Sequence, residues 1–339
     1  MAGMKNGSGN FEAERRWPFR VLLGTVCALL AASLLLNCSA AALLAGKGGE
    51  DVPEDEYPDL QEVASWGEDG PKVVRIELTG AIVRENEESL FGSGPDPVER
   101  VLRQIRAANN DEEVEGILFE VDSPGGGVTA SDEIYHELVK FKEGAEGRVV
   151  VGLVKDMAAS GGYYAMLPCD EIVAQPTAIV GSIGVLMAGV NFSGLAAKAG
   201  VEDMTVKSGA NKDLMNPLKP VDEAQKAILQ AAVDADYERF LGLVAKHRRI
   251  SEKKLRPLCD GRIFSAAEAL SKGFVDAVGY REDALALLAK KLGSEGVRAV
   301  KYEKPSGLLD ELLGMKSPLA PVVSRLGGTA AKREYRWVP

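Results

Sequence analysis

The chain has 339 residues, of which 46% are apolar, so it is long enough for two domains and can bury a sizeable core. Acidic residues outnumber basic ones by 50 to 40, and the net charge of -10 argues against a nucleic-acid partner. The chain has only two histidines, His136 and His247, which argues against a histidine-rich metal site and against a Ser-His-Asp triad. A hydrolase built on this chain would need a different base.

The first organised segment is an uncharged stretch over residues 21–46, which is long enough to cross a bilayer as a helix. Arg15, Arg16 and Arg20 precede it, and acidic residues follow it. The positive-inside rule then places residues 1–20 in the cytoplasm. The sequence therefore predicts one transmembrane anchor, with the rest of the chain on the extracytoplasmic side of the inner or plasma membrane.

Two alternatives for this segment remain open. The small residues at 39–42 also fit the cleavage site of a signal peptide, and Cys38 could be a lipoprotein cysteine. Each version exports the bulk of the chain. Of the four cysteines, Cys169 and Cys259 would then lie in an oxidising compartment, where they could be bridged, although two buried free thiols are the default.

The globular region begins after a linker. Residues 47–71 are acidic, contain glycine and proline and lack apolar periodicity, which predicts a solvated segment. Strands and helices then alternate, which predicts βαβ units, a mostly parallel sheet and an α/β domain over residues 72–295, followed by a tail over 296–339. The predicted strands cover residues 73–78, 116–121, 148–154, 171–174 and 203–207. The predicted helices cover residues 97–108, 129–142 and 222–248, with another after residue 160.

Two glycine-rich turns follow predicted strands and precede predicted helices. They read DSPGGG at residues 122–127 and MAASGGYY at residues 157–164. Glycines there would display bare backbone N–H groups at the carboxyl end of the sheet. Ser160 would lie at the positive end of a helix, with the N–H of Gly161 free to stabilise an oxyanion. Both features also fit ordinary structure, a tight turn in the first case and a helix N-cap in the second.

A nucleophilic serine needs a base. A neutral lysine is the natural candidate here, and a lysine can serve only if burial lowers its pKa. Lys212, in the segment KSGANKDLMNP, is one possibility, and its neighbour Asp213 is a mild objection unless that carboxylate points elsewhere. The residues alone do not favour it over three other lysines, Lys155, Lys207 and Lys219.

Five motifs, in order along the chain, are similar to those of a known protein family. They are DSPGGG, MAASGGYY, TAIVGSIGV at residues 177–185, KSGANKD at residues 207–213 and DGRIFSAAEALSKGFVD at residues 260–276. Together they resemble the signal peptide peptidase A family, membrane-anchored serine proteases of the Clp protease/crotonase-like fold. The resemblance covers residues 72–288 and is to the short, single-domain members, because only one SGG turn is present.

The resemblance implies a role for each motif residue. Ser160 is the nucleophile, Lys212 is the general base, and the hydroxyl of Ser182 orients the lysine. The backbone N–H groups of Gly126 and Gly161 form the oxyanion hole. Ser182 also fits a buried turn serine that bonds to backbone. No metal or other cofactor is required.

The resemblance also implies partners. The substrate is an apolar, extended peptide near the membrane, such as a signal peptide left after preprotein cleavage. The short members look like ring or dome homo-oligomers in which neighbouring subunits help to form the peptide groove. Two rival functions stay open, a crotonase-like acyl-thioester enzyme and a catalytically silent membrane scaffold that binds peptides.

Overall fold

The computed structural model describes residues 56, 58–84, 88–89, 92–93 and 96–304. Within these ranges no helix is both long and apolar enough to cross a membrane. The predicted anchor at residues 21–46 lies outside the described residues, as do residues 1–20 and most of the predicted tail.

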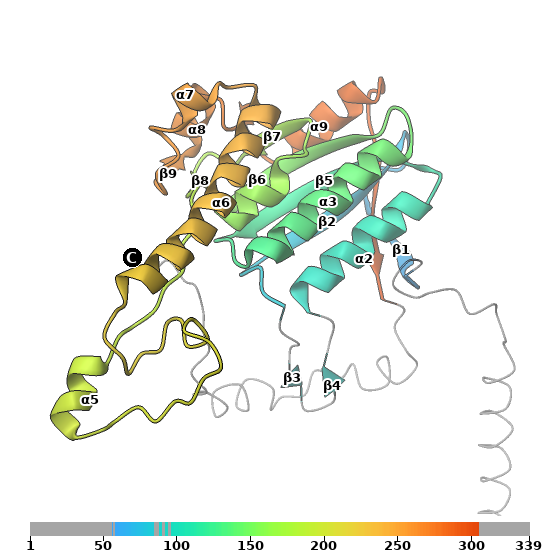
Figure 1. The fold of residues 1–339 in the computed structure, drawn as a ribbon. Coiled ribbons are helices and arrows are strands. Elements are labelled where there is room, and N and C mark those ends of the chain that lie inside the picture. The colour runs from blue at the N-terminus through green and yellow to red at the C-terminus, as the bar shows by residue number, and fades with distance from the viewer. Residues whose placement is uncertain (1–55, 57, 85–87, 90–91, 94–95, 305–339) are drawn as a thin grey trace, which may run out of the picture. The chain divides into compact units, whose positions relative to one another are not determined.

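A mixed sheet organises the described chain (Figure 1). Its strands are β1 (Gln61–Trp66), β2 (Lys72–Thr79), β5 (Val114–Ser123), β6 (Val149–Ala159), β7 (Glu171–Ala174), β8 (Ile179–Gly181), β9 (Ile263–Ser265), β10 (Ala277–Val278) and β11 (Arg298–Glu303). The order is β1-β11-β2-β5-β6-β7-β10, with β8 paired to β6 and β9 to β8. Among the described strands of this sheet, only the β1–β11 and β8–β9 pairs are antiparallel. Two short strands form a separate hairpin, β3 (Glu88–Ser89) and β4 (Gly92–Ser93).

The helices connect these strands. They are α2 (Pro97–Asn110), α3 (Val128–Gly144), α4 (Gly161–Met166), α5 (Ser193–Ala199), α6 (Glu223–Arg248), α7 (Glu252–Leu255), α8 (Ala266–Lys272) and α9 (Arg281–Lys291). Helices α2, α3 and α4 each join two parallel neighbouring strands, in the units β2–α2–β5, β5–α3–β6 and β6–α4–β7. The predicted α/β class with a mostly parallel sheet is confirmed.

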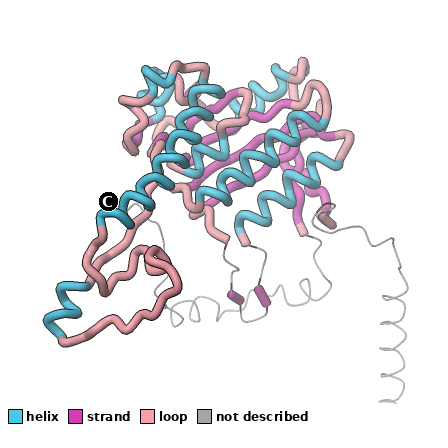
Figure 2. Tube along the Cα trace, viewed as in Figure 1, coloured by secondary structure: helices cyan, strands magenta, loops and turns pink. Residues whose placement is uncertain are grey.

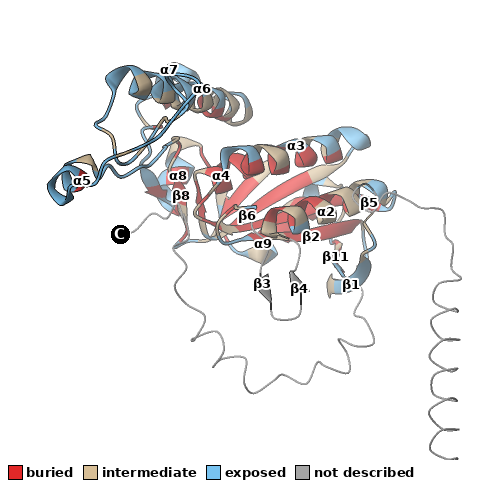
Figure 3. Cartoon of the chain, turned by 60° about the horizontal axis from the view of Figure 1, so that its bottom comes forward, coloured by how far each residue is buried: buried red, intermediate tan, exposed pale blue. Residues whose placement is uncertain are grey.

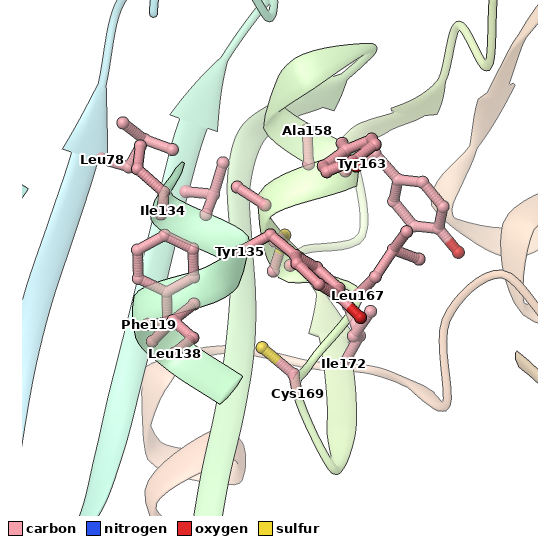
Figure 4. Packing of buried hydrophobic residues seen from close by; sticks show 14 of the residues in the cluster. Leu78, Phe119, Ile134, Tyr135, Leu138, Ala158, Tyr163, Leu167, Cys169 and Ile172 are labelled. Carbon is pink, nitrogen blue, oxygen red and sulfur yellow. The ribbon is translucent and has the colours of Figure 1, made fainter. Parts of the chain in front are cut away.

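Each face of the sheet has its own apolar core, because side chains alternate along a strand. Val74 faces the core shared with α2, α3 and α4, whereas Val73 faces the smaller core under α9. Buried side chains such as Phe119 of β5 and Ile134 of α3 fill the first core (Figure 4). Burial is concentrated along the strands and the helix faces toward them (Figure 3). These cores fix the carboxyl ends of β5 and β6, where the two glycine turns lie.

The structure departs from the sequence predictions at three places. Strand β1 lies in the predicted linker and β11 in the predicted tail, so the folded region extends beyond residues 72–295 on both sides. The two strands pair with each other, and β11 also pairs with β2. No strand forms over residues 203–207, where Val206 is 98% exposed and no neighbouring strand offers a partner. One prediction about side chains is confirmed: Cys169 and Cys259 are buried free thiols.

Residues 186–222, here called the arm, differ from the rest of the fold. Apart from α5 the arm is loop (Figure 2), and many of its large apolar side chains are exposed. Hydrogen bonds tie the arm to itself, for example from Phe192 N–H to the Pro217 carbonyl at 2.6 Å. Gln225, in the first turn of α6, donates to the Ala210 carbonyl at 3.1 Å. The arm is thus anchored through the start of α6.

Candidate functional site

Ser160 occupies the junction between β6 and α4. Its φ of 51° and ψ of -120° are unusual for a residue with a side chain, and such strained backbone is often found at functional sites. Two backbone bonds hold the turn: the Ser160 N–H donates to the Gly181 carbonyl at 2.8 Å, and the Tyr164 N–H donates to the Ser160 carbonyl at 2.9 Å. The turn therefore places a half-buried serine at the N-terminus of a helix.

The other glycine turn, residues 125–127, packs directly against Ser160. A Cβ added to Gly125 would lie 2.7 Å from the Gly161 nitrogen and 2.8 Å from the Ser160 Cβ. One added to Gly161 would lie 3.2 Å from the Gly126 nitrogen. No larger residue fits between the two turns without movement. The structure thus brings together the two turns that the sequence predicted to act jointly.

Two backbone N–H groups in these turns are available to a ligand. Gly161 is the first residue of α4, so its N–H has no acceptor within the helix. The N–H groups of Gly125 and Gly127 donate to Ser123 Oγ and to the Ile82 carbonyl, but the described residues supply no acceptor for that of Gly126. Unpaired N–H groups at a helix N-terminus attract developing negative charge.

Ser182 lies beside this turn. Strand β8 pairs with β6 so that Gly181 is opposite Ala159, which makes Ser182 the neighbour of Ser160 at the next position. Its φ of 50° is again positive, and its N–H donates to the Arg262 carbonyl at 2.7 Å. Four of the predicted site residues are therefore in one place: Ser160, Gly126, Gly161 and Ser182.

The fifth predicted residue, Lys212, is elsewhere. It is an exposed residue of the arm, and its N–H donates to the Gly209 carbonyl at 3.2 Å. None of the contacts found among the described residues joins it to Ser160. Two of the rival lysines, Lys207 and Lys219, form ion pairs with Asp213. Bonds to Asp213 and Asp203 raise the pKa of Lys219, so this lysine stays protonated and is a poor base.

A polar network behind the serine turn was not expected from the sequence. The Tyr164 hydroxyl donates to Asp132 Oδ1 at 2.5 Å, and Arg239 donates to both Tyr164 and Asp132. Burial by itself would raise the pKa of Asp132, but the bonds from Tyr164 and Arg239 hold it below its usual range. The network ties α4 to α3 and α6. No local sequence motif predicts this network, because its members come from three helices.

The histidines have other environments. The His247 ring is 2.9 Å from the Tyr135 hydroxyl, and burial, together with nearby lysine and arginine, lowers the pKa of His247 to about 4. His136 lines a hollow of about 250 Å³ together with arginines and carboxylates. In the part of the chain that the structure describes, no group of three His, Cys, Asp or Glu residues could hold a metal ion.

A strained serine at a strand-to-helix turn, facing two free backbone N–H groups on an α/β sheet, is an arrangement typical of serine hydrolases. Residues 142–295 match the profile of Peptidase family S49. The chain belongs to this family, that of signal peptide peptidase A and protease 4, and is a serine peptidase.

The similar proteins carry peptidase names. "Putative signal peptide peptidase SppA" of Enterococcus faecium is 34% identical over 315 residues, which is 89% of each chain. A putative protease of Synechocystis sp. is 34% identical over 76% of this chain and 88% of its own. "Serine protease SPPA, chloroplastic" of Arabidopsis thaliana is 31% identical over 82% of this chain but only 42% of its own. The family resemblance drawn from the five motifs is confirmed.

Proposed function

We propose that this serine peptidase works as an endopeptidase with a Ser160–Lys212 dyad. The observation that carries the proposal is the backbone of Ser160, which presents a hydroxyl at the start of α4 against the glycine turn 125–127. Ser160 Oγ attacks the peptide carbonyl, and the N–H groups of Gly126 and Gly161 stabilise the oxyanion. Lys212 accepts the serine proton and returns it to the leaving amine, and water then releases the acyl group.

The proposed substrates are apolar, extended peptides at the membrane, above all remnant signal peptides. The relative from Enterococcus faecium is named a putative signal peptide peptidase, which supports this substrate class. The uncharged segment 21–46 supports an anchor that holds the enzyme beside the bilayer. With arginines before the segment, the anchor leaves residues 1–20 in the cytoplasm and the catalytic domain on the extracytoplasmic face.

We also propose that the chain acts as a homo-oligomer in which Lys212 of one copy serves Ser160 of another. The hydrogen bonds and ion pairs of the arm stay within the arm and the first turn of α6, so its own chain does not hold Lys212 near Ser160. Its exposed apolar side chains support a protein partner, with Met204 84% and Val206 98% exposed. A second copy would cover these side chains and supply the base.

Two substitutions in the full-length chain, in detergent micelles, test the dyad. Ser160→Ala and Lys212→Ala should each lower the rate of cleavage of an apolar signal-like peptide by at least about 10³-fold, since nucleophile and base act as a unit. The control is circular dichroism, which should show both variants folded. Labelling by a serine-directed phosphonate should be lost in Ser160→Ala. A Lys212→Ala variant that keeps full activity would show the base to be another residue, and an inert parent would support the scaffold function.

A further inference from the structure

The residue beside the proposed base is held in an unusual way. Both carboxylate oxygens of Asp213 are occupied: Lys207 Nζ is 2.5 Å from Oδ1, and Lys219 Nζ is 2.7 Å from Oδ2. The Asp213 side chain is only 7% exposed, whereas the Lys207 and Lys219 side chains are 30% and 37% exposed. The two lysines hold the pKa of Asp213 well below its usual range, so it remains charged.

Further bonds fix this group, here called the clamp and made of Lys207, Asp213 and Lys219. Lys207 Nζ also donates to the Ala210 carbonyl at 2.6 Å, which closes the loop that carries Lys212. Lys219 Nζ also lies 2.9 Å from Asp203 Oδ2. The clamp therefore joins both ends of the Lys212 loop and turns the Asp213 carboxylate toward two other lysines.

The clamp resolves a difficulty in using Lys212 as a base. A carboxylate next to a lysine favours its ammonium form, and an ammonium cannot take a proton from serine. Here the nearest carboxylate in the sequence is already bonded to Lys207 and Lys219. Asp213 lines a hollow of about 450 Å³ with both of these lysines, and Lys212 is not among its lining residues.

We propose that Asp213 is a positioning residue: Lys207 and Lys219 hold its carboxylate, so that Asp213 keeps the loop in place and Lys212 has no carboxylate partner of its own. This inference rests on the proposed role of Lys212 as the base. It assigns to Lys207 and Lys219 a function that neither could have as the base itself.

The charged groups around the loop come from the arm and from the start of α6. They are Asp203, Lys207, Asp213 and Lys219 of the arm, with Asp222 and Lys226 at the α6 end of the hollow. With Glu223, the partner of Lys226, this set has four carboxylates and three lysines besides Lys212. Removing Lys207 and Lys219 enlarges the excess of carboxylates and releases Asp213, and both effects favour the protonated form of Lys212.

The test is the pH dependence of kcat/KM in the full-length chain, with an apolar peptide that has no titratable side chains. The parent should show one rising limb as its base loses a proton. In the double variant Lys207→Met/Lys219→Met, we expect this limb to move up by about one pH unit, so that kcat/KM falls about tenfold below the limb and stays near the parent value above it. Adding Asp213→Asn to the double variant should move the limb back toward the parent position.

A matched control separates release of Asp213 from loss of positive charge. Lys226 lines the same hollow but pairs with Glu223 and not with Asp213, so Lys226→Met removes a positive charge without releasing Asp213 and should move the limb much less than the double variant does. The double variant could unfold, which circular dichroism would show. In that case Lys219→Gln, which keeps the Lys207–Asp213 bond, should shift the limb less and in the same direction.

Three outcomes would overturn the inference. The first is an equal loss of activity at every pH in the double variant, which would mean that the clamp only shapes the loop. The second is a limb that Asp213→Asn does not restore, and the third is a Lys226→Met variant that shifts as far as the double variant. Failure of the proposed function looks different, because Lys212→Ala would then remain active.

Discussion

Gly125 lies against the Ser160 turn, so its lack of a side chain matters both for the fold and for the proposed chemistry. Its φ of +95° disfavours any side chain, and a Cβ there would lie 2.7 Å from the Gly161 nitrogen and 2.8 Å from the Ala159 carbonyl oxygen. Gly125→Ala should therefore displace the Ser160 turn and lower kcat/KM by about 10²-fold or more, the size of effect seen when an oxyanion donor is lost. Peptide cleavage by the folded variant measures this.

Gly147 offers the matched control. Its φ of +88° is similar, but a Cβ added there has no neighbour within 4 Å. Gly147→Ala should cost about 1–2 kcal/mol of stability through backbone strain alone, with unchanged turnover. Equal losses of turnover in the two variants would show that strain, and not contact with the Ser160 turn, determines the effect.

Single residues also show how far sequence reasoning reaches into the site. Ser160, Gly126 and Gly161 could be predicted to lie together because parallel strands end at one edge of a sheet, and the two glycine turns follow neighbouring strands. The partners of Asp213 could not be predicted. They lie six residues before and after it in irregular loop, where no periodicity relates sequence spacing to side-chain direction.

At the scale of elements, one buried ion cluster joins β2, β5 and the start of α9. Glu120 is fully buried, 2.7 Å from an Arg75 nitrogen and 2.5 Å from an Arg281 nitrogen. Glu120→Gln removes the charge that both arginines share and leaves the buried Arg75 with Glu77, 3.3 Å away, as its remaining carboxylate, so we expect a loss of up to about 3 kcal/mol in the free energy of unfolding. Urea denaturation measures it.

The exposed pair of Glu238 and Arg256 is the control for this prediction. Both side chains are about half exposed, although their contact is as short as 2.6 Å. Water screens such a pair, so Glu238→Gln should leave the denaturation midpoint almost unchanged. If the denaturation midpoint of Glu120→Gln also stayed near that of the parent, the buried cluster would add no net stability.

Elements differ in how plainly their sequence predicts them. Strand β2 is a nearly continuous buried run, and α2 follows Asp96, whose side chain caps the Glu99 N–H at 2.6 Å, so both were predictable. Strand β1 is mostly exposed, and its pairing with β11 joins residues more than 200 positions apart, so no local pattern reveals it. Residues 203–207 alternate polar and apolar side chains as a strand does, but no strand of the described chain pairs with them.

On the scale of the whole molecule, the arm is the part that would need a partner copy if the proposed dyad is correct. It carries Lys212 and many exposed apolar side chains, while Ser160 lies in the buried framework of the sheet. Helix α6 shows the same division, since its buried residues, Phe240, Leu241 and Val244, all lie in its second half. A head-to-tail assembly, in which the arm of each copy covers the next, would bury the arm and complete every site.

Mixing inactive chains tests this assembly. If Lys212 acts on a neighbouring copy, co-expressed Ser160→Ala and Lys212→Ala chains should recover about one quarter of the parent activity, because in a randomly mixed head-to-tail ring about one interface in four joins an intact serine to an intact lysine. Mixing the parent with the double variant Ser160→Ala/Lys212→Ala should also give about one quarter. A dyad within one chain predicts no recovery in the first mixture and about half the parent activity in the second. Chains that fail to mix would give the same two values as a dyad within one chain, so pull-down of differently tagged chains must first show that they share oligomers.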